Sequence, residues 1–124
     1  MFNFRRSKTA CFCRENADGY EIYKAVDSVV SEGYENFLFC AETYIGLEFA
    51  KTVLLRKKKQ TGNSADKIIL VAVISDERHV DDKDELFRND YFSVIEQCDS
   101  YIDLKNNEPL SCEKFMISKS NKII

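Results

Sequence analysis

The stretch Tyr34–Leu55, YENFLFCAETYIGLEFAKTVLL, constrains the fold more than any other part of the chain. Residues 37–40 are continuously apolar and predict a buried strand. A helix follows almost at once, with apolar residues at helical spacing at Ile45, Leu47, Phe49, Val53 and Leu54. A strand leading directly into a helix is the unit of nucleotide-binding α/β layers. The turn between them, Cys40–Tyr44, has no glycine and carries the Glu42 carboxylate, so it lacks the usual phosphate-binding features.

The rest of the chain continues this alternation. Further strands are expected at Lys8–Cys13, Lys67–Ile74, Ser100–Leu104 and Asn121–Ile124. Further helices are expected at Tyr20–Glu32, Glu85–Cys98 and Ser111–Lys119. Helical connections between successive strands require parallel pairing. We therefore expect one α/β domain over residues 1–124, a three-layer Rossmann-like fold with a mostly parallel sheet of about five strands and helices on both faces.

Local signals indicate where several of these elements begin and end. Asp18 is expected to cap the first helix, and Gly33 is expected to end it. A polar loop is predicted at Gln60–Asp66. The segment Ser75–Asp84 is the longest polar run, and it contains the chain's single histidine, His79, which we expect to be solvated.

Composition excludes several classes of protein. The formal net charge of −3 and the pI of about 5.2 give no global electrostatic reason to bind nucleic acid. No apolar run approaches the ~20 residues that span a membrane. An odd number of irregularly spaced cysteines argues against a disulfide framework and favours small core residues in a cytoplasmic protein. These are Cys11, Cys13, Cys40, Cys98 and Cys112.

Several segments carry a family resemblance that covers residues 8–124. Lys67–Ile74 is similar to the pattern I-x-L-I-A-V-I-P, and Arg88–Leu104 to R-Y-x-x-I-L-x-x-A-D-x-V-x-x-L. Lys114–Ile117 with Ser120 is similar to R-Y-M-V-D-x-S. Together they resemble the YpsA/YoqJ-like family of the SLOG superfamily. These bacterial-type Rossmann-like proteins are related to DprA and to the LOG nucleoside-monophosphate phosphoribohydrolases.

The chain departs from this family at its ligand-binding motifs. Where the family has Thr-Gly-His-Arg after its first strand, this chain has Cys13–Asn16. Where the family has G-M-A-x-G-x-D, it has Cys40–Gly46, and Phe49–Lys51 replaces Ala-Ala-Glu. The chain also ends before the family's Gly-Gly-Thr turn and last helix. The resemblance thus implies a degenerate, non-catalytic domain that binds or senses a nucleotide or nucleotide derivative, without a cofactor.

Topology supplies the candidate site. Residues that follow the first three strands lie at the carboxyl edge of a parallel sheet, where ligands of this architecture bind. The candidate ligand-binding residues are Cys13, Arg14, Glu15, Glu42, Thr43, Tyr44, Ser75 and Asp76. No catalytic residue and no metal ligand is predicted, because no catalytic or metal-binding arrangement of side chains stands out.

Other functions stay open at this point. The basic run Arg56, Lys57, Lys58 and Lys59 would carry single-stranded DNA binding by analogy with DprA, although the net charge opposes it. A LOG-like phosphoribohydrolase is a further alternative, although the chain has no Gly-Gly pair. Whether the chain is an enzyme is left open, with a non-enzymatic role favoured. The expected partners are a nucleotide-derived small molecule and a protein or a second copy of the chain, without a membrane.

Overall fold

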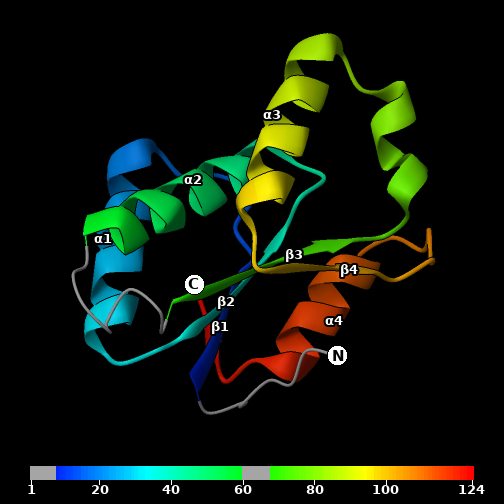
Figure 1. Cartoon of the computed structure of the whole chain (residues 1–124). Coiled ribbons are helices and arrows are strands. Elements are labelled where there is room, and N and C mark those ends of the chain that lie inside the picture. The colour runs from blue at the N-terminus through cyan, green and yellow to red at the C-terminus, as the bar shows by residue number, and fades with distance from the viewer. Residues whose placement is uncertain (1–7, 60–67) are drawn as a thin grey trace.

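The computed structural model describes residues 8–59 and 68–124 (Figure 1). In this part of the chain the strands are β1 (Thr9–Phe12), β2 (Asn36–Cys40), β3 (Ile69–Ile74), β4 (Ser100–Asp103) and β5 (Lys122–Ile123). The helices are α1 (Gly19–Ser31), α2 (Tyr44–Lys59), the 3₁₀ helix η3 (Glu77–Asp82), α3 (Glu85–Gln97) and α4 (Ser111–Lys119). The loop predicted at Gln60–Asp66 and the first residue of the next predicted strand, Lys67, lie outside the described residues.

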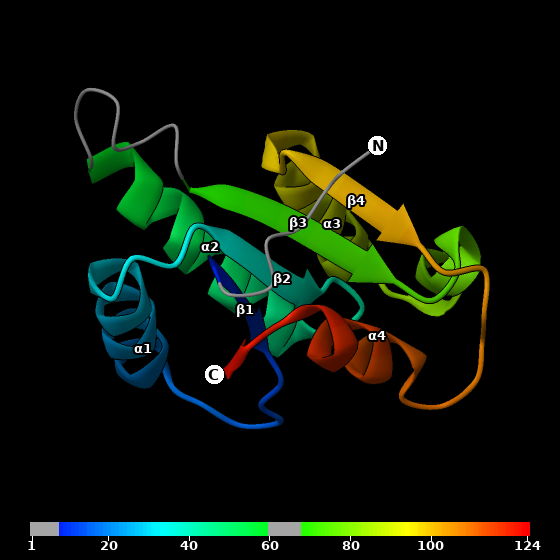
Figure 2. The same cartoon turned by 90° about the horizontal axis from the view of Figure 1, so that it is seen from below.

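The five strands form one parallel sheet in the order β4-β3-β2-β1-β5. From β1 to β4 each connection moves one strand in the same direction, so α1, α2 and α3 cover the same face (Figure 1). The connection from β4 returns across the sheet to β5 and places α4 on the opposite face (Figure 2). The result is a three-layer α/β Rossmann-like fold, which confirms the predicted fold class.

Both faces of the sheet are buried, as the apolar strands predict. In β2, Phe37 and Phe39 pack into the larger core beneath α1, α2 and α3, while Leu38 packs on the other side. The smaller core beneath α4 consists of Cys11, Leu38, Val71, Val73, Cys112 and Met116. Full burial of a Phe or Leu side chain contributes about 1.5–3 kcal/mol of stability. Because Cys112 and Met116 are the buried residues of α4, this smaller core is what holds α4 on the sheet.

The helix ends follow local capping rules. The Asp18 carboxylate accepts a hydrogen bond from the Glu21 backbone N–H at 2.8 Å, and the Glu21 carboxylate accepts one from the Asp18 N–H at 3.2 Å. This reciprocal pair is a capping box, and it confirms Asp18 as the cap of α1. Gly33 follows α1 with a φ of +94°, a conformation that favours glycine, so the predicted end of the helix is also confirmed.

The segment Ser75–Asp84 is not simply a loop. Most of it forms η3, whose first turn is capped by Asp76. The Asp76 carboxylate accepts a hydrogen bond from the Arg78 N–H at 2.8 Å. Because His79 of this short helix packs against Tyr91 of α3, the expectation of a solvated side chain fails at His79.

The longest helix, α2, has one buried face. Its buried residues are Gly46, Leu47, Phe49, Ala50 and Val53, and it ends in four basic residues. Among the residues that the structure describes, no helix combines the length and the apolar character needed to cross a membrane.

Candidate functional site

A pocket of about 520 Å³ lies at the edge of the sheet where the parallel strands end. Residues at or just after the ends of β1, β2 and β3 line one side of it. Residues 107–113, which connect β4 to α4 and begin that helix, line the other side together with Met116. Open α/β sheets bind ligands outside the carboxyl ends of their strands, so the topology places the candidate site in this pocket.

The pocket brings together six of the eight residues predicted for ligand binding, namely Cys13, Arg14, Glu15, Glu42, Thr43 and Ser75. Tyr44 and Asp76 do not line it. The Tyr44 hydroxyl donates to the Asp84 carboxylate at 3.3 Å, and Asp76 is occupied by the N–H and guanidinium groups of Arg78. These two side chains therefore contact the neighbouring helix ends and lie outside this pocket, and their part in ligand binding stays a prediction.

The first turn of α2 borders the pocket and is already capped. The Thr43 hydroxyl accepts a hydrogen bond from the Gly46 N–H at 3.0 Å, and the Thr43 carbonyl accepts one from the Leu47 N–H at 3.1 Å. Thr43 is therefore the N-cap of α2. Since its hydroxyl occupies one of the free N–H groups, this helix end offers fewer donors to an anion than an uncapped end would.

Gly46 allows α2 to start very close to β2. A Cβ atom at this position would lie 1.9 Å from the carbonyl oxygen of Cys40. No side chain fits at that distance, so the helix can approach the end of the strand only with glycine here. Close helix–strand packing is also the task of the last glycine in dinucleotide-binding turns. The glycines that admit phosphate in such turns have no counterpart in residues 40–44.

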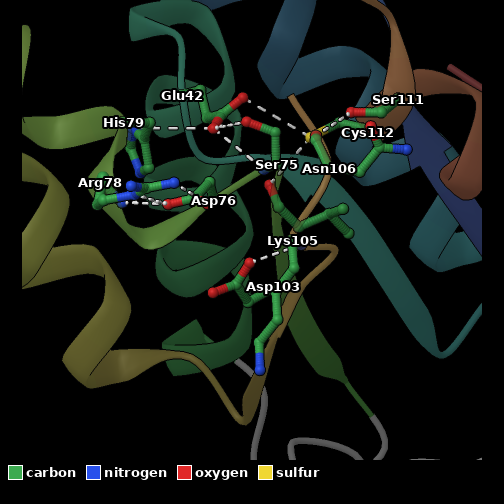
Figure 3. Close-up of polar contacts among 11 residues, drawn as sticks. Glu42, Ser75, Asp76, Arg78, His79, Asp103, Lys105, Asn106, Ser111 and Cys112 are labelled. Atoms are coloured by element: carbon green, nitrogen blue, oxygen red, sulfur yellow. Dashed lines mark hydrogen bonds and ion pairs between the residues drawn. The ribbon is translucent and has the colours of Figure 1, made fainter. Parts of the chain in front are cut away.

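Glu42 is the centre of the polar network in the pocket (Figure 3). Its Oε2 atom accepts hydrogen bonds from the Ser75 hydroxyl at 2.6 Å and from the Ser75 backbone N–H at 3.0 Å. Its Oε1 atom lies 3.7 Å from the Cys112 sulfur, which donates to it. The carboxylate thus connects the ends of β2 and β3 with the first turn of α4.

His79 is buried, and the expectation that it is solvated is wrong. Its side chain is only 7% exposed, and its ring packs edge-on against Tyr91 with centroids 4.8 Å apart. The Nδ1 atom lies 4.0 Å from Oε2 of Glu42. Neither ring nitrogen has a hydrogen-bond partner among the described residues. Burial lowers the pKa of His79, so the ring is neutral at pH 7.

Two thiols meet beside Glu42. Cys40 ends β2 and Cys112 lies in the first turn of α4, and their sulfur atoms lie within 4.8 Å of each other. The neighbouring Cys112 thiol lowers the pKa of Cys40, because it stabilises a Cys40 thiolate. The neighbouring Cys40, burial and the nearby Glu42 charge raise the pKa of Cys112.

Sequence reasoning missed this half of the pocket. The sequence predicts that Cys40 and Cys112 are small core residues and that a helix begins at Ser111, and it assigns neither thiol to the pocket. The rule that selected Ser75 takes residues that directly follow a strand, and Cys112 lies in α4, nine residues after the end of β4. Three potential metal-ligand atoms, one each from Cys40, Glu42 and Cys112, lie within 4.8 Å of one another, although no metal ligand was predicted.

The pocket is acidic. Among the described residues that line it, Arg14 is the only cation, whereas Glu15, Glu42, Glu108 and Glu113 are carboxylates. Arg14 is itself 3.7 Å from a carboxylate oxygen of a residue in α1, as an exposed ion pair. The local charge opposes anionic ligands and favours neutral or cationic ones.

The basic run at residues 56–59 lies far from this pocket, at the opposite end of α2. The Arg56 guanidinium is 3.1 Å from the Asp27 carboxylate, and the Lys57 ammonium is 3.5 Å from the Asp99 carboxylate. A third cation of the run lies over a tyrosine ring. Because these cations have partners within the chain, the structure gives no added support to DNA binding, which stays a prediction.

Comparison with known proteins adds no family assignment. A scan against models of protein families found no match, and a search of curated proteins found no matching relative. The resemblance to the SLOG superfamily therefore stays a prediction, and the function is argued from the geometry of the pocket.

Proposed function

We propose that the chain is a non-catalytic domain that binds a nucleotide-derived small molecule through its nucleoside part. The observation that carries this proposal is the position of the pocket, at the carboxyl edge of a parallel sheet and beside the first turn of α2. That edge is the general binding place of open α/β sheets. The cavity of about 520 Å³ is also within the usual size range of small-molecule sites, roughly 300–1,000 Å³.

The lining of the pocket supports a nucleoside more than a phosphate group. Ile45 and the exposed Leu110 offer apolar surface to a base. Carboxylates can accept hydrogen bonds from sugar hydroxyls, as the acidic residue of dinucleotide-binding folds does. The carboxylates of Glu15 and Glu113 have this capacity, whereas Arg14 is the only cation among the described residues that line the pocket.

A non-catalytic role is supported by the way Glu42 is engaged. One carboxylate oxygen accepts two hydrogen bonds from Ser75, and the other faces the Cys112 sulfur. A general base must reach the proton that it removes from a substrate. In this arrangement both oxygens of Glu42 already have protein partners, so neither is free to take a proton from a substrate.

Thermal unfolding of the purified chain with a panel of ligands tests this proposal. The panel contains adenosine, guanosine, AMP, ADP-ribose, NAD, cyclic nucleotides and ATP. A ligand at 100 times its Kd adds about 2.7 kcal/mol of stability, which raises Tm by several degrees in a domain of this size. We expect at least one nucleoside or weakly charged derivative to raise Tm, and ATP to have the smallest effect.

Charge variants distinguish ligand binding in the pocket from a general effect of net charge on the Tm shifts. Glu15→Gln with Glu113→Gln removes two pocket carboxylates, and we expect the Tm shifts of AMP and ADP-ribose to increase. Glu96→Gln, an exposed change on α3 outside the pocket, is the matched control and leaves all shifts unchanged. A cooperative melt that responds to no ligand would contradict the proposal. Chromatography of each ligand after incubation tests the non-catalytic part, since every ligand should be recovered intact.

A further part of the proposal is that ligand binding acts through another protein chain. The sequence favours a protein partner or a second copy of the chain, and this stays a prediction.

A further inference from the structure

Three side chains at the inner end of the pocket have the atoms and the spacing of a metal site. The Cys40 sulfur, a carboxylate oxygen of Glu42 and the Cys112 sulfur all lie within 4.8 Å of one another. Cys40 and Glu42 come from the end of β2, and Cys112 comes from α4 on the other face of the sheet. We propose that these three side chains bind a zinc ion, whose fourth coordination position opens into the pocket.

The spacing suits tetrahedral zinc. Zinc–sulfur and zinc–oxygen bonds of ~2.3 and ~2.1 Å at the tetrahedral angle place the two ligand atoms about 3.6 Å apart. The Cys112 sulfur lies 3.7 Å from Oε1 of Glu42. The ligand atoms therefore need only small side-chain adjustments to surround the ion, and no movement of the sheet.

Glu42 is held in the orientation that a metal ligand needs. Its Oε2 atom is fixed by the hydroxyl and the backbone N–H of Ser75, while Oε1 faces the Cys112 sulfur (Figure 3). Metal-bound carboxylates are usually hydrogen-bonded in this way, which sets their direction and strengthens binding. The existing hydrogen bonds leave Oε1 available to coordinate the ion once the Cys112 thiol has lost its proton.

His79 gives a second, independent indication. Its side chain is more than nine-tenths buried, and neither ring nitrogen has a hydrogen-bond partner among the described residues. An unpaired buried polar group is costly and uncommon in native proteins. The Nδ1 atom lies 4.0 Å from Oε2 of Glu42. In the metal-bound state His79 donates from Nδ1 to this oxygen, and so acts as a positioning residue for Glu42.

The ligand chemistry selects the ion. Two thiolates are soft ligands that favour zinc over magnesium or calcium, which prefer oxygen. Three protein ligands with one open position are the pattern of zinc sites that exchange water or a small molecule. The nearby carboxylates of Glu15 and Glu113 raise the local concentration of cations. Binding releases the two thiol protons to solvent and involves no redox step.

This inference does not depend on the proposed nucleoside. It rests on the ligand atoms of the chain itself, and metal binding is measured without any organic ligand. A chain that binds zinc but no nucleoside would leave the zinc site standing, and the reverse result would leave the nucleoside proposal standing.

Cobalt and zinc titrations of the full, reduced chain test the site. Co²⁺ should give a thiolate-to-cobalt charge-transfer band with one-to-one stoichiometry, and an equivalent of Zn²⁺ should remove it. Cys40→Ser and Cys112→Ser should each lose most of the band, whereas Cys98→Ser, a thiol at the end of α3, should keep it. His79→Ala should weaken Zn²⁺ binding about 10–100-fold. His79→Asn, which retains an N–H donor, should restore most of the affinity.

Thiol protection provides a test that needs no variant. The wild-type chain is alkylated with and without one equivalent of Zn²⁺, and each cysteine is followed by mass spectrometry. We expect Zn²⁺ to slow the alkylation of Cys40 and Cys112, because a metal-bound thiolate is not free to attack the reagent, while the rate at Cys98 is unchanged. Equal rates with and without the ion, or protection that spares Cys40 and Cys112, would overturn the proposal.

Discussion

Glu42 and Ser75 are joined by two hydrogen bonds to a single carboxylate oxygen, at 2.6 Å from the hydroxyl and 3.0 Å from the backbone N–H. Glu42 follows β2 and Ser75 follows β3, which are neighbours in the parallel sheet. The pair therefore links the turn before α2 to the end of the next strand. The two hydrogen bonds also satisfy the Glu42 carboxylate at the edge of the sheet where related architectures place phosphate-binding glycines.

Removal of the Ser75 hydroxyl should destabilise the chain. Ser75→Ala deletes the shorter bond to a partly buried carboxylate, and hydrogen bonds to charged groups contribute about 1.5–3 kcal/mol. We expect a loss of that order in the free energy of unfolding, measured by urea denaturation. Ser93→Ala changes an exposed serine in α3 and should stay within about 0.5 kcal/mol of wild type. Similar effects of the two changes would refute the structural role of Ser75.

Gly46 should tolerate no side chain. In Gly46→Ala the new Cβ atom meets the Cys40 carbonyl oxygen, so α2 must move away from β2. Overpacking of this kind costs about 1–3 kcal/mol, and the shift should lower Tm and change the pocket. Gly19→Ala is the matched control, because a Cβ atom at Gly19 meets nothing within 4 Å and alanine favours the first turn of α1. An unchanged Tm in Gly46→Ala would contradict the close approach of helix and strand.

The cap of α1 should contribute measurably to stability. Asp18→Ala removes the side chain that accepts from the Glu21 N–H, and such a loss costs about 1 kcal/mol. The exposed residue Asn16 precedes the cap, and Asn16→Ala should have little effect on the same urea transition. If both changes were neutral, the capping box would not hold the helix start.

The fold could be predicted because its determinants are local. The continuous apolar run of β3, the cap at Asp18 and the stop at Gly33 each specify one element within a few residues, and the alternation of elements then requires a parallel sheet. The pocket could be predicted only on the side formed by β1, β2 and β3. Cys112 lies 70 residues from Glu42 in sequence, and only the return of α4 across the sheet brings them together.

His79 illustrates the second limit of sequence reasoning. Its neighbours in sequence are charged, and local composition therefore indicated a solvated side chain. In the structure η3 turns the imidazole inward against Tyr91, a residue of the following helix. Burial here depends on how two helices pack, and polar composition alone does not determine that.

The pH dependence of stability should reveal the burial of Cys98. Burial raises the pKa of this thiol from an ordinary value of 9.0 to about 12. The unfolded chain therefore loses the thiol proton at a lower pH than the folded chain. The stability that the protonated thiol gives to the folded chain is complete below pH 9 and declines as the pH rises toward 12. Cys98→Ala should flatten the fall in unfolding free energy between pH 9 and 11 relative to wild type. Parallel slopes for the two proteins would contradict this account.

The most direct test of the central claim is to map where a nucleoside binds on the ¹⁵N-labelled chain by NMR. The panel member with the largest Tm shift is titrated while backbone amide signals are followed. The account predicts concentration-dependent shifts at residues 13–15, 43, 45, 46, 107, 108 and 110–113, which line the pocket from its two sides. Signals of residues 56–59, at the far end of α2, should remain in place. Shifts centred on residues 56–59, or no saturable shift around the pocket, would contradict the claim that the carboxyl edge of the sheet is a binding site.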